Sequence, residues 1–332
     1  MIRRMIPIWG AIIGIVALMF TSTVLAASAS VTTSYPYTAN DILTGVSNIY
    51  DFDIYDGGDT LVVWDGSNLK TYEVSSGDMI ENLGAPTGYS GWASFVTIDP
   101  SEETVWIGFT VYGTNNDRIY QVDLDDAEWH HVASLSGNFD LDFYDGDAFV
   151  SGLNQVWSGG TSDTNCIWLL DTSGNNNHQK VIELDGNSAG LAIDPDSGDF
   201  YYASYNGDYA RQLYRWDSND VQTAISTTTY LTYTHGTKLS DLEGGAYDVD
   251  VDEDGNVIFN GNGVSGSYNG SYLAVWNGTA GNGYRYDIIG TGSSGSSHWF
   301  TMIGTVGDIT SGGTVYQGDY YTSGLAVVEH SP

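Results

Sequence analysis

The sequence of 332 residues is poor in cysteine and in proline, and almost no part of it shows helical periodicity. Its single cysteine, Cys166, excludes an intrachain disulfide. Because Cys166 lies in the apolar segment NCIWLLD, we expect a buried and unreactive thiol. Stability must therefore come from packing, from closure of the fold or from a bound metal.

Basic residues are also scarce. Nine lysines and arginines stand against 42 aspartates and glutamates, which gives a formal net charge of −33. This imbalance argues against nucleic acid and against an anionic membrane surface as partners. It suits cations, basic partners or a saline exterior.

The first 29 residues have the pattern of a secretion signal. Arg3 and Arg4 precede the uncharged apolar run MIPIWGAIIGIVALMF, and TSTVLAASA offers small residues for cleavage after Ala26 or Ala29. An uncleaved membrane anchor is the alternative, since the run approaches the length of a bilayer span. We therefore expect a signal peptide over 1–29, one domain over 30–332, and an extracellular or periplasmic location.

Short runs of Val, Ile, Tyr, Phe and Trp alternate with clusters of Gly, Asn, Asp and Ser, which indicates an all-β protein. These runs form six similar units. Their first strands are expected at 50–56, 94–100, 139–145, 190–196, 247–254 and 299–305, with starts 44, 45, 51, 57 and 52 residues apart. Such spacing is typical of four-stranded blades, so we predict a six-bladed β-propeller.

The sixth unit ends after its third strand. The segment SVTTSYPYT (30–38) is expected to supply the missing outer strand and so to close the ring, which removes exposed sheet edges. In the fourth unit, VQTAIS (221–226) is the expected outer strand. The long insertion that follows, 226–246, is our first choice for a loop that determines specificity.

Two segments carry a resemblance to known propellers: VTIDPSEETVWIGFTVYGTNNDRIYQVDLD (96–125) and LAIDPDSGDFYYASYNGDYARQLYRWD (191–217). They resemble the repeats of the six-bladed NHL and YWTD groups, in which an Ile-Asp-Pro turn joins the two inner strands and an Arg-Ile-Tyr or Leu-Tyr-Arg strand follows. The resemblance spans most of 30–332, although no unit has an intact Tyr-Trp-Thr-Asp. It implies the fold, and it implies no particular activity because propellers host enzymes, adhesins and scaffolds.

Asp-x-Asp occurs on the first strand of the first, third and fifth units. Alternate residues of a strand share a face, and the first strand of a blade lies nearest the axis. We therefore expect six carboxylates around one axis, those of Asp51, Asp53, Asp140, Asp142, Asp248 and Asp250. They could accept backbone N–H groups of a neighbouring blade, or they could bind a cation. Hard oxygen ligands favour Ca²⁺, with Mg²⁺ second.

Aromatic residues near loops are candidates for ligand contact. We assign this role to Trp92, Trp157, Trp299 and Tyr233; Tyr112 and Tyr205 lie in similar segments. Such side chains could stack on sugar rings or anchor a protein partner. Ordinary packing in the core or at the rim of the propeller is the alternative.

These features favour a secreted, non-enzymatic binding or surface-assembly module that engages a protein or glycan through one face, with Ca²⁺ as the expected cofactor. One alternative is a Ca²⁺-dependent lactonase or esterase, in which the ion polarises a carbonyl and orients water. Another is a structural subunit of an extracellular layer or filament.

Overall fold

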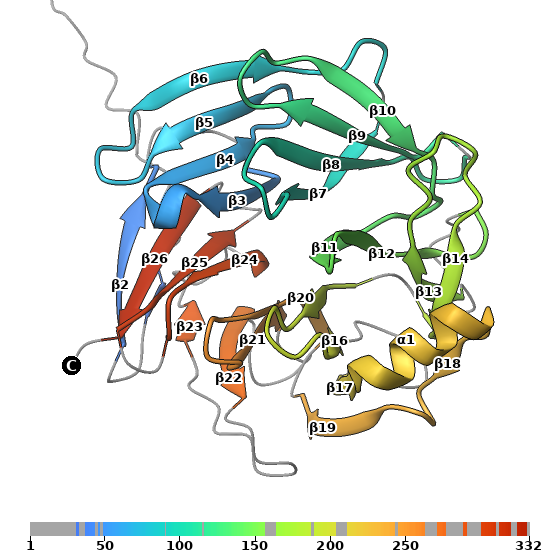
Figure 1. Cartoon of the computed structure of the whole chain (residues 1–332). Helices are drawn as coiled ribbons and strands as arrows, with labels where there is room; N and C mark the ends of the chain where they lie inside the picture. The colour runs from blue at the N-terminus through green and yellow to red at the C-terminus, as the bar shows by residue number, and fades with distance from the viewer. Residues whose placement is uncertain are drawn as a thin grey trace, which may run out of the picture.

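The computed structural model of the chain is a six-bladed β-propeller (Figure 1). It describes residues 31–32, 37–43, 46, 49–89, 91–114, 116–156, 164–186, 189–203, 211–242, 245–262, 271–276, 288–290, 300–309, 312–319 and 324–330. The expected signal peptide and two of the candidate ligand-contact residues, Trp157 and Trp299, lie outside these residues. The predicted fold class is confirmed.

The first three blades each run outward from the axis in chain order. Blade 1 contains β3 (Asp51–Tyr55), β4 (Thr60–Trp64), β5 (Leu69–Glu73) and β6 (Met79–Gly84), with the 3₁₀ turn η1 (Asp56–Gly58) between β3 and β4. Blade 2 contains β7 (Trp92–Ile98), β8 (Thr104–Thr110), β9 (Arg118–Asp123) and β10 (Trp129–Ala133). Blade 3 contains β11 (Asp140–Tyr144), β12 (Asp147–Leu153), β13 (Asn165–Leu169) and β14 (Gln179–Glu183), with the short parallel strand β18 (Leu231–Thr232) at its outer edge.

The other three blades complete the ring. Blade 4 contains β15 (Leu191–Ile193), β16 (Phe200–Ala203), β17 (Gln212–Trp216) and β19 (Thr237–Asp241). Blade 5 contains β20 (Gly245–Val251), β21 (Val257–Asn262), β22 (Ser271–Trp276), β23 (Ile288–Gly290) and, at its outer edge, β1 (Val31–Thr32). Blade 6 contains β24 (Phe300–Val306), β25 (Thr314–Asp319), β26 (Gly324–His330) and β2 (Tyr37–Ile42).

An N-terminal strand closes the ring, at a slightly later position than we expected. Strand β2 pairs antiparallel with β26 from Tyr37↔His330 to Ile42↔Leu325, so the outer strand of blade 6 is 37–42 and not 30–38. The two residues of β1 instead pair with β23 of blade 5. The N-terminal segment therefore contacts two blades that come from the other end of the chain.

The expected outer strand at 221–226 is wrong, because these residues lie inside the helix α1 (Ser218–Thr227). Asp217 caps the helix, because its side chain accepts the backbone N–H of Asn219 at 2.9 Å. The side chains of Val221 and Ala224 are buried, so this side of the helix packs against the protein. The outer strand of blade 4 is β19. In the described part of the chain, no helix is long and apolar enough to span a membrane.

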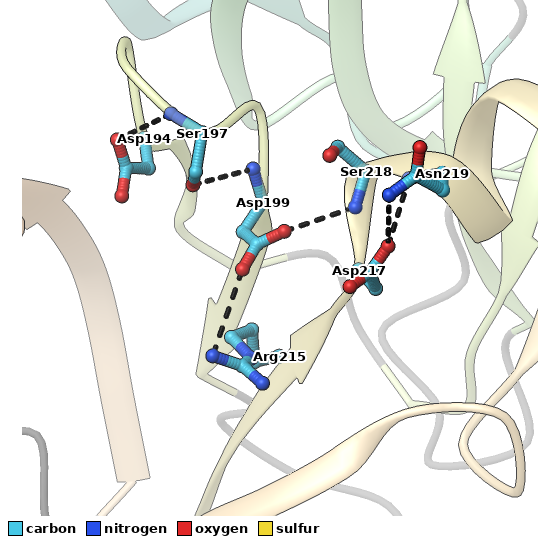
Figure 2. Close-up of polar contacts among 7 residues, drawn as sticks. All are labelled: Asp194, Ser197, Asp199, Arg215, Asp217, Ser218 and Asn219. Atoms are coloured by element: carbon cyan, nitrogen blue, oxygen red, sulfur yellow. Dashed lines mark hydrogen bonds and ion pairs between the residues drawn. The ribbon is translucent and has the colours of Figure 1, made fainter.

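The start of α1 is also fixed by the preceding hairpin (Figure 2). Asp199 accepts the backbone N–H of Ser218 at 2.9 Å, and its other carboxylate oxygen lies 3.6 Å from Nη1 of Arg215. The insertion 226–246, expected as a loop, therefore forms the end of α1, strands β18 and β19 and the start of β20. Much of it packs on the outer sides of blades 3 and 4 instead of presenting a free loop.

The apolar core lies between successive blades. Phe149 of blade 3, for example, packs edge-on against Phe200 of blade 4 with ring centroids 4.8 Å apart. Phe52 of blade 1 lies in the same cluster as Met302 of blade 6. Each fully buried side chain of this size stabilises the fold by about 1.5–3 kcal/mol, so every blade depends on both neighbours.

The ring has two distinct ends, which we name by their connections. The turn face carries the tight turns between the first and second strands, such as 99–103 and 194–199. The loop face is the opposite end, where the first strands begin and the second strands end. Each first strand therefore runs from the loop face to the turn face.

Two neighbouring proline substitutions test ring closure by β2. Backbone N–H groups alternate in direction along an edge strand, so only one of Ala39→Pro and Asn40→Pro removes a hydrogen bond to β26. We expect that variant to lose about 1–3 kcal/mol of unfolding free energy in urea denaturation, and the other to stay much nearer the wild type. Two variants of unchanged stability would contradict closure by β2.

Candidate functional site

The innermost strand of each blade has one edge without a neighbouring strand. Strands β3, β7, β11, β20 and β24 surround the centre of the ring in this way (Figure 1). Their inward N–H groups need acceptors, because an unsatisfied buried N–H costs free energy comparable to a lost hydrogen bond. The six predicted aspartates lie on three of these strands, β3, β11 and β20.

Each of these aspartates joins its own blade to the next. In blade 1, Asp53 Oδ1 accepts the N–H of Ile54 at 2.7 Å, and Asp53 Oδ2 accepts the N–H of Ile98 in blade 2 at 2.7 Å. Asp51 Oδ2 likewise accepts the N–H of Val96 at 2.6 Å. One carboxylate thus satisfies two inward donors, one on its own strand and one across the joint between blades.

Blades 3 and 5 repeat this arrangement. Asp140 and Asp142 accept from Leu191 N and Ile193 N of blade 4, both at 2.6 Å. Asp248 accepts from Ile303 N of blade 6 at 2.7 Å, and Asp250 accepts from the hydroxyl of Thr305 at 2.8 Å. The aspartates therefore tie the blades together as pairs: 1 with 2, 3 with 4, and 5 with 6.

The joints between these pairs are built differently. At the joint between blades 2 and 3, the Thr97 hydroxyl donates to the carbonyl of Leu141 at 3.1 Å. At the joint between blades 4 and 5, the Gly190 N–H donates to the carbonyl of Tyr247 at 2.8 Å. Across these two joints the described residues show no carboxylate bridge between inner strands.

The carboxylates form two rings of three around the axis. Asp51, Asp140 and Asp248 lie toward the loop face, and burial raises the pKa of each well above its usual range, as does repulsion from a neighbour in the same ring. In the second ring, burial raises the pKa of Asp53 to about 7 and that of Asp142 to about 8. The backbone N–H bonds oppose this effect without cancelling it.

Asp250, the third member of the second ring, has the smallest shift. Burial raises its pKa to about 6, while the hydrogen bond from Thr305 works in the opposite direction. No lysine or arginine lies in the three Asp-x-Asp strands to neutralise these charges. Near neutral pH the rings therefore hold protons that ordinary carboxylates would have released.

The observed geometry matches the first of the two interpretations, in which the aspartates accept N–H groups across blades. Both oxygens of Asp53, Asp140, Asp142 and Asp248 are already engaged. Within the described residues, no group of three or more His, Cys, Asp or Glu side chains is placed to hold a metal ion. The described residues therefore show no calcium site, and calcium binding stays a prediction.

The two described aromatic candidates have opposite environments. Trp92 is 59% exposed at the start of β7, on the loop face. Tyr233 is only 6% exposed and packs against Tyr214 and Trp216, with ring centroids 4.8 and 5.9 Å away. Its predicted role in ligand contact is therefore corrected: it is a core residue beneath α1 and β18.

Tyr112 lies close to Trp92 in the fold and is 56% exposed. The two segments approach closely because residue 91 is glycine, with φ at +125°. A Cβ atom at Gly91 would lie 2.6 Å from the carbonyl oxygen of Thr110 and 2.8 Å from a methyl carbon of Val111. We call the exposed pair Trp92 and Tyr112 the aromatic patch.

A buried carboxylate holds the segment that carries Tyr112. Asp117 is 1% exposed and accepts the N–H groups of Val111 and Gly137, both at 2.6 Å. It thereby fixes the loop after β8 to the connection that enters blade 3. Nothing in the local sequence marks Asp117 for this role, because its partners are a loop and a glycine of another blade.

Cys166 is fully buried, and burial raises the pKa of its thiol to about 12. The thiolate that a nucleophile or metal ligand requires is therefore absent at physiological pH. The predicted burial of the thiol is confirmed.

No protein-family model matches the sequence, and no curated protein matches it. Solved structures of similar architecture include the carbohydrate-active enzyme of family AA12 from Trichoderma reesei in its calcium structure, with 11% identity and a TM-score of 0.61 over 94% of this chain and 100% of that chain. Regucalcin from Agrobacterium tumefaciens, a calcium-binding protein, has 12% identity and a TM-score of 0.58 over 90% and 97%. A glucose dehydrogenase has 11% identity and a TM-score of 0.58 over 89% and 99%. These likenesses show the fold alone, and the expected resemblance to six-bladed propellers is confirmed.

The raised pKa values predict that stability falls as the pH rises. Unfolded aspartate carboxyl groups titrate at about pH 3.9, so between about pH 4 and 8 Asp53 and Asp142 bind more protons in the folded protein than in the unfolded chain. The contribution of Asp53 and Asp142 to unfolding free energy is therefore fully present below about pH 4 and is lost by about pH 8.

Urea denaturation between about pH 5 and 8 measures this slope. In Asp142→Asn, we expect a slope that is shallower by up to about 1.4 kcal/mol per pH unit. The matched control is Asp147→Asn, an exposed aspartate on the paired strand β12, whose slope should equal that of the wild type. A wild-type stability that rises across this range would refute the assignment.

Proposed function

We propose that the protein is a secreted, non-enzymatic binding module that holds a protein or glycan on its loop face. The observation that carries the proposal is Trp92, a large apolar side chain that is 59% exposed on a strand of the rigid ring. Aromatic side chains in such positions provide a disproportionate share of binding energy in many interfaces. The proposed secretion is based on residues 1–29, whose sequence has the pattern of a signal peptide.

The backbone around Trp92 is held in place by the fold, which favours a role of this residue in binding. Gly91 and the Asp117 bridge hold both segments of the aromatic patch in place before any partner arrives. A partner then meets side chains whose backbone is already ordered, so less entropy is lost on association. This is the arrangement expected of a recognition surface on a rigid fold.

The two alternatives make different predictions for the same purified chain. A lactonase or esterase hydrolyses members of a lactone and aryl-ester panel and loses that activity in chelator. A subunit of an extracellular layer or filament assembles with increasing concentration, which light scattering detects. A binding module does neither, and it retains a partner through the loop face.

The substitution Trp92→Ala tests the proposal directly. We expect it to weaken binding by about tenfold or more in a biosensor screen against extracellular proteins and glycans, because truncation removes the anchor. Met79→Ala is the matched control, since Met79 is 54% exposed at the start of β6, at the turn-face end of blade 1. Equal binding by wild type and Trp92→Ala would overturn the proposal.

Calcium dependence is a separate part of the proposal, and the six axial carboxylates motivate it. Thermal unfolding in chelator and then in Ca²⁺ or Mg²⁺ tests it. A site on the axis predicts about 2.7 kcal/mol of added stability at a concentration of ~100 times the dissociation constant. The shift should shrink when Asp53, Asp142 and Asp250 are replaced by Asn. If no cation changes the midpoint temperature of unfolding, calcium dependence is wrong, and hydrogen bonding between blades is the role of these residues.

A further inference from the structure

The aromatic patch lies within two uncharged stretches of a strongly acidic protein. Residues 82–98 and 104–116 contain no Asp, Glu, Lys, Arg or His, although the chain as a whole has 42 acidic residues. These two segments contain the end of β6, all of β7 and β8, and the connections that flank β7 and β8 on the loop face. The surface around Trp92 and Tyr112 is therefore built from aromatic, small and neutral polar residues.

The charges that border the patch are already paired within the protein. Asp65 lies near Tyr89 and forms an ion pair with Lys70. Asp117 is buried and is engaged by two backbone N–H groups. Neither carboxylate offers a charge to a ligand on the patch.

The unpaired acidity is concentrated elsewhere. Each of the first five blades exposes an acidic residue in the turn between its first and second strands, namely Asp56, Glu102, Asp145, Asp196 and Glu253. These turns contain no lysine or arginine. A basic partner is thus attracted to the turn face, at the opposite end of the ring from the aromatic patch.

We infer that the aromatic patch binds a neutral polysaccharide, with sugar rings stacked on Trp92 and Tyr112. The inference rests on the proposed function and narrows its ligand to one class. An uncharged hexose presents an apolar C–H face to an aromatic ring and hydroxyl groups around its edge. The patch offers the matching chemistry: two exposed rings, bordered by the exposed neutral polar side chains of Thr87 and Asn116.

Exposed glycines leave room for a ligand near the two rings. Gly88, Gly91 and Gly113 are exposed beside the two rings, so no bulky side chain rises between them at these positions. Binding through two preformed stacking positions orders little of the protein. A charged polysaccharide fits less well, because an anionic chain meets the net charge of −33, and Arg118 beside these segments already donates through Nη1 to the carbonyl oxygen of Asp117.

Affinity electrophoresis of the full mature chain tests the inference, in gels that contain hydroxyethyl cellulose, galactomannan or polygalacturonate. We expect one or both neutral polymers to retard the protein and polygalacturonate to leave its mobility unchanged. Retardation should be the same from about 0.05 to about 0.5 M NaCl, because screening does not weaken uncharged contacts.

Four variants identify the surface. Trp92→Ala and Tyr112→Ala should each weaken retardation by about tenfold. Tyr112→Phe keeps the ring and should behave as the wild type, as should Met79→Ala. Unchanged melting temperatures show that each variant is folded.

The outcomes separate this inference from the proposed function. If no neutral polymer retards the protein, but an extracellular protein partner binds and is lost in Trp92→Ala, the glycan inference is wrong and the binding module stands. Retardation that persists in both alanine variants places the polysaccharide elsewhere and overturns the assignment to the patch. If Trp92→Ala changes binding to no protein and to no glycan, both proposals fail.

Discussion

The propeller depends on how it satisfies the inward edge of its innermost strands. Every blade ends at the axis with a strand that has no neighbouring strand on one side, and these inner edges surround the centre of the ring. Water or a bound ligand could satisfy these donors, but the chain uses its own carboxylates. An aspartate suits this task because each of its oxygens accepts one N–H, one from the next residue and one from the next blade. These hydrogen bonds hold neighbouring inner strands in register, and the apolar side chains between the blades then pack against each other.

This solution gathers six half-buried carboxylates around the axis, and the consequences are visible in the pKa values. Burial and mutual repulsion favour protonation of the rings, while the N–H bonds favour the charged form. A protonated carboxyl group keeps lone pairs that accept an N–H, so the joints survive proton uptake. The acidic side chains of the turn face are exposed to water, so their charges carry no such cost of burial. Aspartate thus has two roles in this protein: it accepts hydrogen bonds between blades near the axis, and it supplies negative charge on the surface.

The period of about 50 residues and the rule that alternate strand residues share a face were enough to predict six blades and the gathering of the six aspartates. They could not show which atoms the carboxylates contact, because Val96 and Ile193 become partners only through the spacing between blades. The helix α1 was missed since the apolar residues of VQTAIS are also compatible with a strand; in the structure Asp217 caps the helix, and Val221 and Ala224 are buried. Tyr233 looked like a loop residue because the sequence does not reveal that α1 and β18 cover it.

The alternation of blades has a consequence for how such a ring can change size. Blades that supply carboxylates alternate with blades that receive them, as the contacts of Asp51 and Asp53, Asp140 and Asp142, and Asp248 and Asp250 show. A closed circle of two alternating types requires an even number of members. Duplication or loss of a single blade would bring two suppliers or two receivers together at one joint, leaving either crowded carboxylates or unmatched N–H groups. The structural unit of this ring is therefore a pair of blades, one that supplies carboxylates and one that receives them.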